Sequence, residues 1–424
     1  MWWLNKGLSP GRSEQAPCQG FFKYGAFIRK KITPPLYKNY GTSYNEEKMK
    51  GSVVKLLKRF SVENFKGFRD KITMDLGSPS NYGFNTEIIE NGCVTKGVIY
   101  GINGSGKSNL GLAIFDIITH LTDKHKMLRN YDYYINLGGR KAFAEFEYLF
   151  LFDGHEVKYW YSKTDVETLK EERLFIDEKE VIYYDFEDND GFTILEGSET
   201  LNASIKSEST ISRVKYVNSN SILADNEQNA VFKKFMDFVD RMLLFYSLDD
   251  KGFEGFMDAS EGVGEGIIKA GKVKEFQEFL NENDIHYNLY VKESDDKKAL
   301  YCRFGNRGAA FFRLASTGTK SLALFYYWYI RMEKASFVFA DEFDAFYHFE
   351  LSESVLKRLR GIPGVQVLAT THNTDLMSNE FLRPDCYFLL QKNVVKAIPE
   401  LTEKELRQAH NLQKMYKAGA FNDR

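Results

Sequence analysis

One glycine-rich octet carries the clearest chemistry in this sequence. The stretch Gly101-Ile-Asn-Gly-Ser-Gly-Lys-Ser108 matches the pattern G-x-x-x-x-G-K-[ST] in full. Its glycines allow backbone conformations that turn several N–H groups toward phosphate oxygens, and a helix that starts there adds partial positive charge. Lys107 would neutralise the β- and γ-phosphates, and the Ser108 hydroxyl would take one position around Mg²⁺. The residues expected to hold a nucleoside triphosphate are Asn103, Gly104, Ser105, Gly106, Lys107 and Ser108.

A pair of acids ends the apolar stretch Phe337-Val-Phe-Ala-Asp341-Glu342. Burying adjacent carboxylates is costly unless a cation or a substrate needs them. Together with the octet, Asp341 is expected to hold Mg²⁺ through water. Glu342 is expected to orient or deprotonate the water that attacks the γ-phosphate. The alternative is an ordinary strand-to-loop boundary at which both acids are solvated.

Two further polar groups follow the same logic. His372 ends a second buried strand, Gly364–Thr371, and we expect it to reach the γ-phosphate; the alternative is an ordinary histidine at a strand end. The stretch Ser316-Thr-Gly318-Thr begins an apolar helix over 322–330. By itself that stretch is a helix cap, and it becomes an anion site if the phosphate of another molecule comes near.

The elements that must position these residues can be predicted from periodicity. Gly97–Tyr100 is a short apolar strand before the octet, and Asn109–Ile118 has a helical pattern after it. From Arg313 onward the chain alternates helix, apolar strand, helix and apolar strand, which is typical of a parallel or mixed sheet. These patterns predict an α/β protein with a P-loop.

Two other regions have their own patterns. Apolar residues alternate over 146–152 and again over 157–161, with Asp153-Gly154 between them, which predicts an antiparallel hairpin. Helical stretches over 231–244 and 273–280 flank the glycine-rich run 261–271, which predicts a helical subdomain joined by a flexible loop. No heptad pattern persists, so no long coiled-coil arm is expected.

These patterns divide the chain into five segments. They are a basic extension (1–48), an N-terminal lobe with the octet and an antiparallel β-subdomain (49–225), a helical insertion (226–300), a C-terminal lobe with the acidic pair and His372 (301–400), and a helical tail (401–424).

The first segment differs in charge from the rest. It carries 8 Lys or Arg against 3 Asp or Glu, while the whole chain carries 57 against 59, a formal net charge of −2. A basic arm that touches phosphates is one interpretation. The favoured alternative is that translation begins at Met49, where the regular pattern starts.

Composition excludes several classes of protein. The apolar fraction is 43% with only 8 Pro, which excludes a disordered or collagenous chain. The 4 cysteines lie far apart without a C-x-x-C pair, so neither a disulfide framework nor a zinc site is expected. No signal peptide and no apolar stretch of membrane-spanning length is present, so we expect a cytoplasmic protein without a membrane partner.

The order of these motifs resembles the ABC-type ATPases of the SMC, RecF and OLD branch, often labelled AAA-type ATP-binding proteins. Phe60–Phe68 looks like their N-terminal strand, the octet like Walker A, Ser316–Thr319 like a diverged signature motif, and Asp341-Glu342 like Walker B. The stretch from Thr371 to Asp375 is similar to their switch histidine. The signature reads Ser-Thr-Gly-Thr instead of Ser-Gly-Gly-Gln, and no glutamine between the octet and the signature is assigned to the Q-loop.

The resemblance implies an ABC-type head that binds ATP and Mg²⁺ and hydrolyses ATP slowly. It implies that two ATP molecules lie between head-to-tail copies, so that Ser316 and Gly318 of one copy meet the nucleotide held by the octet of the other. Ser108 and Asp341 would be the metal-side residues, and Glu342 and His372 the catalytic ones. A homodimer or a higher oligomer is therefore expected.

Three functions are compatible with this interpretation. The first is an ATP-dependent switch that regulates a separate effector protein, a nuclease or a toxin, in phage defence, because too few residues follow His372 for the nuclease domain of full OLD proteins. The second is a DNA-repair or chromosome-associated clamp like RecF or SMC, with DNA as a partner; the absent coiled coil and the slightly acidic charge disfavour it. The third is a nucleotide-binding scaffold without hydrolysis, which the intact Lys107 and acidic pair disfavour.

Overall fold

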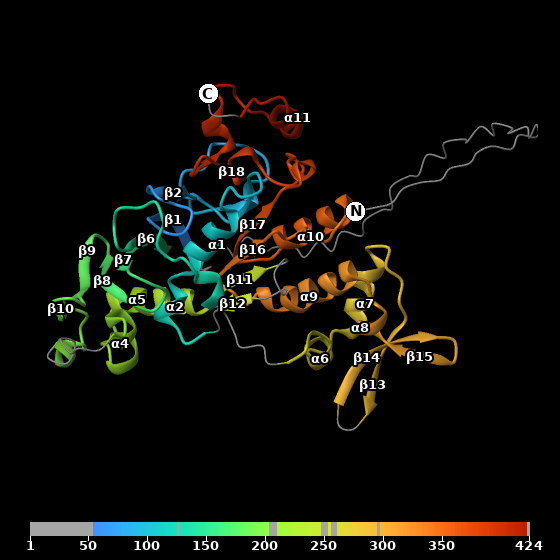
Figure 1. The fold of residues 1–424 in the computed structure, drawn as a ribbon, viewed down its shortest axis with the longest axis horizontal. Helices are drawn as coiled ribbons and strands as arrows, with labels where there is room; N and C mark the ends of the chain where they lie inside the picture. The colour runs from blue at the N-terminus through green and yellow to red at the C-terminus, as the bar shows by residue number, and fades with distance from the viewer. Residues whose placement is uncertain are drawn as a thin grey trace, which may run out of the picture. The chain divides into compact units, whose positions relative to one another are not determined.

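A seven-stranded mixed sheet underlies the octet and the acidic pair (Figure 1). The computed structural model describes residues 54–124, 128–202, 210–246, 253–255, 261–294 and 297–421. The strand order is β12-β11-β16-β17-β5-β18-β19, with the five central strands parallel and the two edge strands antiparallel. The strands are β5 (Lys96–Tyr100), β11 (Met242–Tyr246), β12 (Phe253–Gly255), β16 (Phe337–Asp341), β17 (Gln366–Thr371), β18 (Tyr387–Gln391) and β19 (Val394–Ala397).

The flanking helices of this sheet pack closely. They are α1 (Lys107–Phe115), α9 (Thr317–Met332) and α10 (Phe349–Arg360). Gly111 on α1 lies against the ring of Phe339 on β16, where an added Cβ would come within 2.7 Å of a ring carbon. The octet therefore links a buried strand to a helix pressed onto the sheet, as predicted from the apolar stretches on either side of it.

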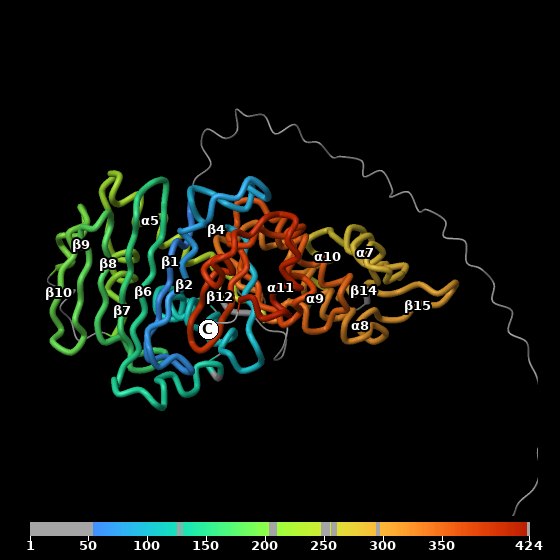
Figure 2. The backbone as a smooth tube through the Cα atoms, turned by 90° about the horizontal axis from the view of Figure 1, so that it is seen from above, coloured from blue at the N-terminus to red at the C-terminus, as the bar shows by residue number. Residues whose placement is uncertain are grey.

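A second sheet is antiparallel throughout, and its seven strands lie side by side in the order β10-β9-β8-β7-β6-β1-β2 (Figure 2). The hairpin predicted around Asp153-Gly154 is confirmed: both residues have positive φ, 51° and 97°, and every second residue of β6 is buried. The strands are β1 (Lys55–Glu63), β2 (Ile72–Asp75), β6 (Ala144–Phe152), β7 (His155–Lys163), β8 (Leu169–Ile176), β9 (Lys179–Asp185) and β10 (Asp190–Thr193).

One side chain joins the two sheets. Gln366, at the start of β17, is 1% exposed; it accepts a hydrogen bond from the Leu57 N–H at 2.8 Å and donates to the Leu57 carbonyl at 2.9 Å. It also donates to the Val94 carbonyl at 2.8 Å. The register of β1 against β6 shifts between Leu57 and Arg59. Because that bulge interrupts the ladder, the Leu57 backbone groups are free to pair with Gln366.

A buried ion pair ties the helix of the octet to the antiparallel sheet. Asp116 follows α1 directly, and Lys163 ends β7; both side chains are fully buried, with Nζ 3.0 Å from the carboxylate. The Tyr134 hydroxyl donates to the same carboxylate at 2.7 Å, and Lys163 also donates to the Thr119 hydroxyl at 2.6 Å. The end of α1 is therefore held by hydrogen-bonded charge rather than by apolar packing alone.

The segment expected to be a helical insertion is only partly helical. Helix α5 (Glu227–Asp240) stops before Leu243 and Leu244, which belong to β11, so the helix predicted through residue 244 is wrong at its end. A helix, α6 (Val263–Lys269), occupies the run expected to be a flexible loop. Its glycines allow rings to approach: an added Cβ would come within 2.7 Å of Phe312 at Gly264 and within 2.2 Å of Tyr327 at Gly266. The helix predicted over 273–280 is confirmed as α7 (Val273–Asn281).

A small third sheet follows α7. Its strands β13 (Leu289–Ser294), β14 (Lys297–Phe304) and β15 (Arg307–Ala310) are antiparallel, and helix α8 (Phe311–Leu314) leads from it into α9. The remaining short elements are β3 (Ile89–Glu90), β4 (Cys93–Val94), α2 (Ile118–Leu121), α4 (Arg213–Asn220) and the 3-10 helices η2 (Thr86–Ile88), η3 (Leu128–Tyr131), η4 (Glu199–Leu201), η6 (Thr374–Leu376), η7 (Pro384–Cys386) and η8 (Ile398–Leu401).

The tail holds one short helix, α11 (Leu412–Lys417), so most of its described part is not helical. The predictions for residues 1–48 lie outside the described residues. Within the described ranges, no helix combines the length and apolar character needed to cross a membrane.

Candidate functional site

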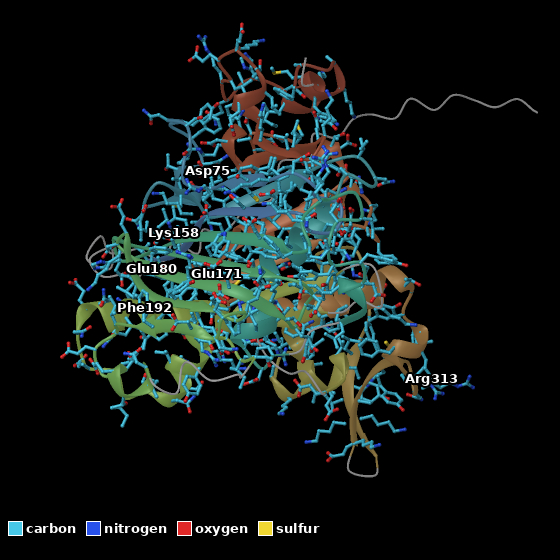
Figure 3. The ribbon with its side chains drawn as sticks, turned by 60° about the vertical axis from the view of Figure 1, so that its left-hand side comes forward. Asp75, Lys158, Glu171, Glu180, Phe192 and Arg313 are labelled. Atoms are coloured by element: carbon cyan, nitrogen blue, oxygen red, sulfur yellow. The ribbon has the colours of Figure 1, made fainter. Side chains whose placement is uncertain are left out.

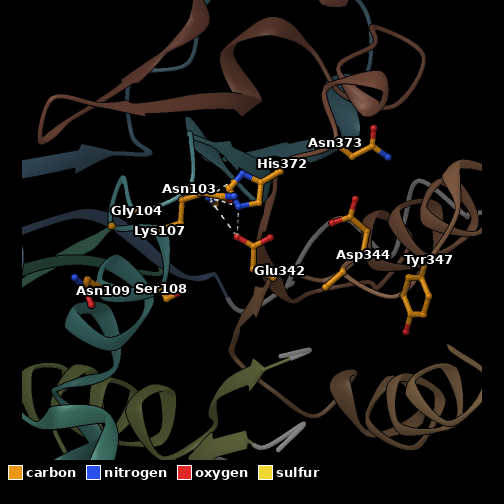
Figure 4. Close-up of a pocket in the computed structure, with 12 residues that line it drawn as sticks. Asn103, Gly104, Lys107, Ser108, Asn109, Glu342, Asp344, Tyr347, His372 and Asn373 are labelled. Carbon is orange, nitrogen blue, oxygen red and sulfur yellow. Dashed lines mark hydrogen bonds and ion pairs between the residues drawn. The ribbon is translucent and has the colours of Figure 1, made fainter. Parts of the chain in front are cut away.

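The octet, Glu342 of the acidic pair and His372 meet at one pocket of about 790 Å³ (Figure 4). The three segments come from the ends of β5, β16 and β17, which are neighbours in the parallel part of the sheet. Because these strands run in the same direction, their carboxyl ends share an edge. The residues that line the pocket are Asn103, Gly104, Gly106, Lys107, Ser108, Asn109, Glu342, Asp344, Ala345, Tyr347, His372 and Asn373.

The loop between β5 and α1 has a conformation that requires glycine. Gly104 and Gly106 have φ of 77° and 102°, in the left-handed region that side chains disfavour. At Gly101 an added Cβ would come within 2.4 Å of the Ser105 Oγ. That Ser105 Oγ is buried and has no hydrogen-bond partner among the described residues. The loop therefore has the shape of a phosphate cradle and carries one unsatisfied hydroxyl.

Lys107 stands at the centre of the site, with its side chain 4% exposed. Its Nζ donates to the Gly101 carbonyl at 3.0 Å and lies 2.9 Å from the His372 Nε2. It is also 3.3 Å from the Glu342 Oε1, and that same oxygen lies 2.8 Å from the His372 Nε2. Figure 4 shows these three side chains pointing at one another. The Glu342 carboxylate thus balances the positive charge of Lys107. It does so at the position where the phosphate of a bound nucleotide would lie.

Ser108 and Asp341 form a separate oxygen cluster beside this triad. The Ser108 hydroxyl donates to Asp341 Oδ2 at 2.6 Å, and the Thr370 hydroxyl donates to Oδ1 at 2.8 Å. Burial raises the pKa of the Asp341 carboxyl, and the hydrogen bonds from these hydroxyls act in the opposite direction. A hydroxyl and a carboxylate next to a phosphate loop fit Mg²⁺, which takes one or two protein oxygens and completes its shell with water and phosphate.

The backbone at Glu342 is strained. Its φ is 46°, a left-handed value that costs a side-chain-bearing residue about 1 kcal/mol or more. The Glu342 N–H donates to the Thr370 hydroxyl at 2.8 Å, which holds the turn. Glu342 therefore leaves the end of β16 in a fixed direction and reaches back toward Lys107 instead of continuing along the strand.

Asp344 forms the opposite wall of the pocket. The Thr371 hydroxyl donates to its Oδ2 at 2.7 Å, and burial raises the pKa of the Asp344 carboxyl. The Tyr347 hydroxyl lies 3.4 Å from the Ser321 hydroxyl on α9, and burial raises the pKa of Tyr347 well above its ordinary value. This wall links the pocket to the helix that begins at Ser316.

Most of the residues predicted for the site are brought together. Asn103, Gly104, Gly106, Lys107, Ser108, Glu342 and His372 line the pocket, and Asp341 contacts Ser108 from behind. Ser105 is in the loop but does not line the pocket. Ser316 and Gly318 do not line it either: Ser316 caps α9 by accepting the Thr319 N–H at 3.1 Å.

Some functional positions were missed from the sequence. Thr370 belongs to none of the motifs found in the sequence, yet its hydroxyl holds both Asp341 and the Glu342 backbone; the one general signal is a hydroxyl residue near the end of a buried strand. Asn109 and Tyr347 had no signal, because their place in the pocket depends on how α1 and the loop before α10 turn.

The comparisons with known proteins agree with this geometry. Residues 98–378 match the family model described as "AAA domain, putative AbiEii toxin, Type IV TA system". That range includes the octet, the acidic pair and His372. No curated protein matches the chain.

Several solved structures are similar to this chain at low identity. The SMC head domain from Thermotoga maritima is 15% identical with a TM-score of 0.37, over 82% of this chain and 99% of that one. A Smc head domain with coiled coil and joint from Pyrococcus yayanosii is 10% identical with a TM-score of 0.42, over 86% and 100%. A SmcHead bound to the C-winged helix domain of ScpA is 12% identical with a TM-score of 0.38, over 81% and 96%.

The family match covers well over half of the chain, and the strand order, the loop and the acidic pair are those of a P-loop protein. The chain therefore belongs to this AAA-domain family.

Proposed function

We propose that this protein binds ATP with Mg²⁺ in the pocket above the octet and hydrolyses it slowly, as a dimeric switch that controls a separate effector protein. The observation that carries the proposal is the convergence of Lys107, Glu342 and His372 within 3.3 Å of one another beside the Ser108–Asp341 pair. Phosphoryl transfer needs little more than positioning and charge neutralisation, and this set supplies both.

Each side chain has a distinct part in this proposal. Lys107 exchanges its contact with Glu342 for phosphate oxygens, because a phosphate carries more negative charge than one carboxylate. Glu342, released from Lys107, accepts a hydrogen bond from the attacking water and orients it in line. His372 donates to the γ-phosphate, and its neighbour Glu342 keeps its ring oriented.

Ser108 and Asp341 are the residues that would hold the metal, Ser108 directly and Asp341 through water. Mg²⁺, when bound, neutralises charge on the β- and γ-phosphate oxygens. The Ser108 hydroxyl donates its proton to Asp341, which leaves the lone pairs of the hydroxyl oxygen available to a metal ion.

A second copy of the chain would complete the site. Ser316 and Gly318 do not line the pocket of their own chain, and Ser316 is exposed at the start of α9. Hydroxyl and backbone N–H groups at a helix start suit the phosphate of a nucleotide held by another copy. The link from Tyr347 to Ser321 offers a path by which nucleotide in the pocket affects α9.

The effector is proposed to be a nuclease or a toxin in phage defence. The description of the family, which names a toxin of a toxin–antitoxin system, supports a role in such two-component systems. Under this proposal ATP occupancy changes the dimer, and the dimer surface releases or recruits the effector.

The test is ATP turnover as a function of protein concentration. Phosphate release per copy should rise with concentration, because hydrolysis needs the dimer, and titration calorimetry should show Mg²⁺-dependent ATP binding. Turnover per copy that is independent of concentration would contradict the shared site. Binding without any phosphate release would identify a nucleotide-binding scaffold instead of an ATPase.

A further inference from the structure

The small sheet β13–β15 has one packed face and one open face. Leu300 and Cys302 on β14 are 2% and 0% exposed and point toward the helices. Successive side chains of a strand alternate between faces, so Tyr301 and Arg303 belong to the other face. Tyr290 pairs with Tyr301 across the ladder, which places it on the open face as well. In Figures 1 and 2 these strands lie at the opposite end from β10.

The open face carries two aromatic rings with cations beside them, and the planes of the rings are tilted by 49°. The ring centroids of Tyr290 and Tyr301 are 5.9 Å apart. The Lys292 Nζ lies 5.1 Å from the centre of the Tyr301 ring, and the Arg303 Cζ lies 5.0 Å from that of Tyr290. At Gly308 on β15 an added Cβ would come within 2.0 Å of the Tyr290 Oη. The Tyr290 side chain therefore extends across the neighbouring strands and lies over Gly308, which leaves room for it because glycine has no side chain.

The charges on this face have one sign. Lys292, Lys297 and Arg303 are exposed, and among the described residues of the three strands the only acidic side chain, Glu293, belongs to the opposite face with its partner Lys298. Arg313, just beyond the sheet, points into solvent (Figure 3). Residues 287–314 contain six Lys or Arg against three Asp or Glu, in a chain whose net charge is −2. The face is thus a local basic patch on a slightly acidic protein.

We propose that this face binds a single strand of nucleic acid. Bases would stack on the Tyr290 and Tyr301 rings and on the planar Arg303 guanidinium, while Lys292 and Lys297 contact phosphates. A sheet that offers neighbouring aromatic rings between cations suits unpaired bases, whose faces are open, better than a duplex, whose bases are already stacked. An acidic protein segment would use the cations but leave the rings unused. This inference stands independently of ATP binding.

The decisive comparison uses two arginines on opposite faces of one hairpin. Arg303 pairs with Gly308, and the next pair along the ladder joins Phe304 to Arg307, so Arg303 and Arg307 point to opposite faces. Anisotropy of a labelled oligo(dT), without nucleotide, should show a loss of roughly tenfold or more in affinity for Arg303→Glu. Arg307→Glu makes the same charge change and should lose about threefold or less.

The rings supply a second readout. Tyr290→Ala and Tyr301→Ala should each lose roughly five- to hundredfold in affinity, while Tyr301→Phe keeps most of it, because stacking needs the ring and not the hydroxyl. Circular dichroism and thermal melting of each variant establish that the sheet remains folded. Equal losses for Arg303→Glu and Arg307→Glu would overturn the proposal. The proposal would also be overturned if duplex DNA displaced the probe as effectively as unlabelled oligo(dT) does. Equally effective displacement by poly-glutamate would overturn it too, and would point to an acidic protein partner.

Discussion

The buried Lys107 ammonium lies 3.3 Å from the Glu342 carboxylate, so the lysine of the octet is paired with the acid that is proposed to orient the attacking water. This ion pair keeps two charges satisfied in a place where neither is well hydrated. It also means that nucleotide binding must break a contact before it makes new ones. Binding of the phosphates to Lys107 and release of Glu342 from Lys107 are therefore one event.

Replacing Lys107 with alanine should abolish measurable ATP binding. The variant loses the cation that the phosphates need and leaves Glu342 next to them, where like charges repel. Titration calorimetry with Mg²⁺ and ATP measures the effect, and Lys274→Ala is a suitable control because that lysine is 86% exposed on α7. ATP affinity unchanged in Lys107→Ala would show that the octet is not the phosphate site.

Glu342→Gln should trap an ATP-bound dimer. The amide keeps the size of the side chain but cannot accept a proton from water, so nucleotide stays bound and the shared site stays closed. Light scattering with ATP should give a dimer that persists, with phosphate release reduced by about a hundredfold or more. Glu350→Gln, on the exposed first turn of α10, is the matched control. A monomeric variant that hydrolyses ATP rapidly contradicts the assignment.

Asp344 should make the nucleotide-free protein lose stability as pH rises. Burial raises the pKa of this carboxyl, so its contribution to stability is present below its unfolded pKa of about 3.9 and is lost as pH rises through the higher folded pKa. The amide of the Asp344→Asn variant has no such proton to lose and can still accept the Thr371 hydroxyl. The melting temperature of Asp344→Asn relative to wild type should therefore increase between about pH 4 and pH 8.

The control for that experiment is Asp375, a carboxyl whose pKa is lowered in the folded protein instead of raised. A hydrogen bond from Lys417 lowers the pKa of the exposed Asp375, so its contribution is present at high pH and is lost on acidification. Asp375→Asn should accordingly lose melting temperature relative to wild type toward high pH. If both variants changed with the same sign, burial of Asp344 would not be the cause.

Local patterns predicted the elements that carry the site because motif and periodicity agree there. The apolar strand before Gly101 and the helix after Ser108 need no long-range information, since a phosphate loop joins them directly. The same holds for β16, where an apolar run ends in two acids.

The failures have a common physical cause, which is that distant packing decides the outcome. Met242-Leu-Leu continues the apolar pattern of α5, and only its place between β16 and β12 makes it a strand. The glycines of α6 predict a loop from the sequence alone. In the structure they lie in a helix, where they make room for the rings of Phe312 and Tyr327. Within the site, Thr370 gains its role from hydrogen bonds to a strand that lies 29 residues earlier in the chain.

Gln366 supplies a final prediction, about stability. Gln366→Leu removes the partners of the buried Leu57 N–H and of two carbonyls, and should lower the free energy of unfolding by about 2–5 kcal/mol, measured by urea titration. Gln408→Leu, on an exposed side chain, is the control.

Gln366→Glu separates hydrogen bonding from packing at the same position. The carboxylate can still accept the Leu57 N–H, but it faces the carbonyls of Leu57 and Val94, and neither can donate to it. Protonation restores a donor, so the pKa of the new carboxyl is raised in the folded state, and its contribution to stability is lost as pH rises. The deficit of Gln366→Glu should therefore shrink toward about pH 5, while that of Gln366→Leu stays constant. Parallel pH dependence in the two variants would mean that Gln366 only fills space between the sheets.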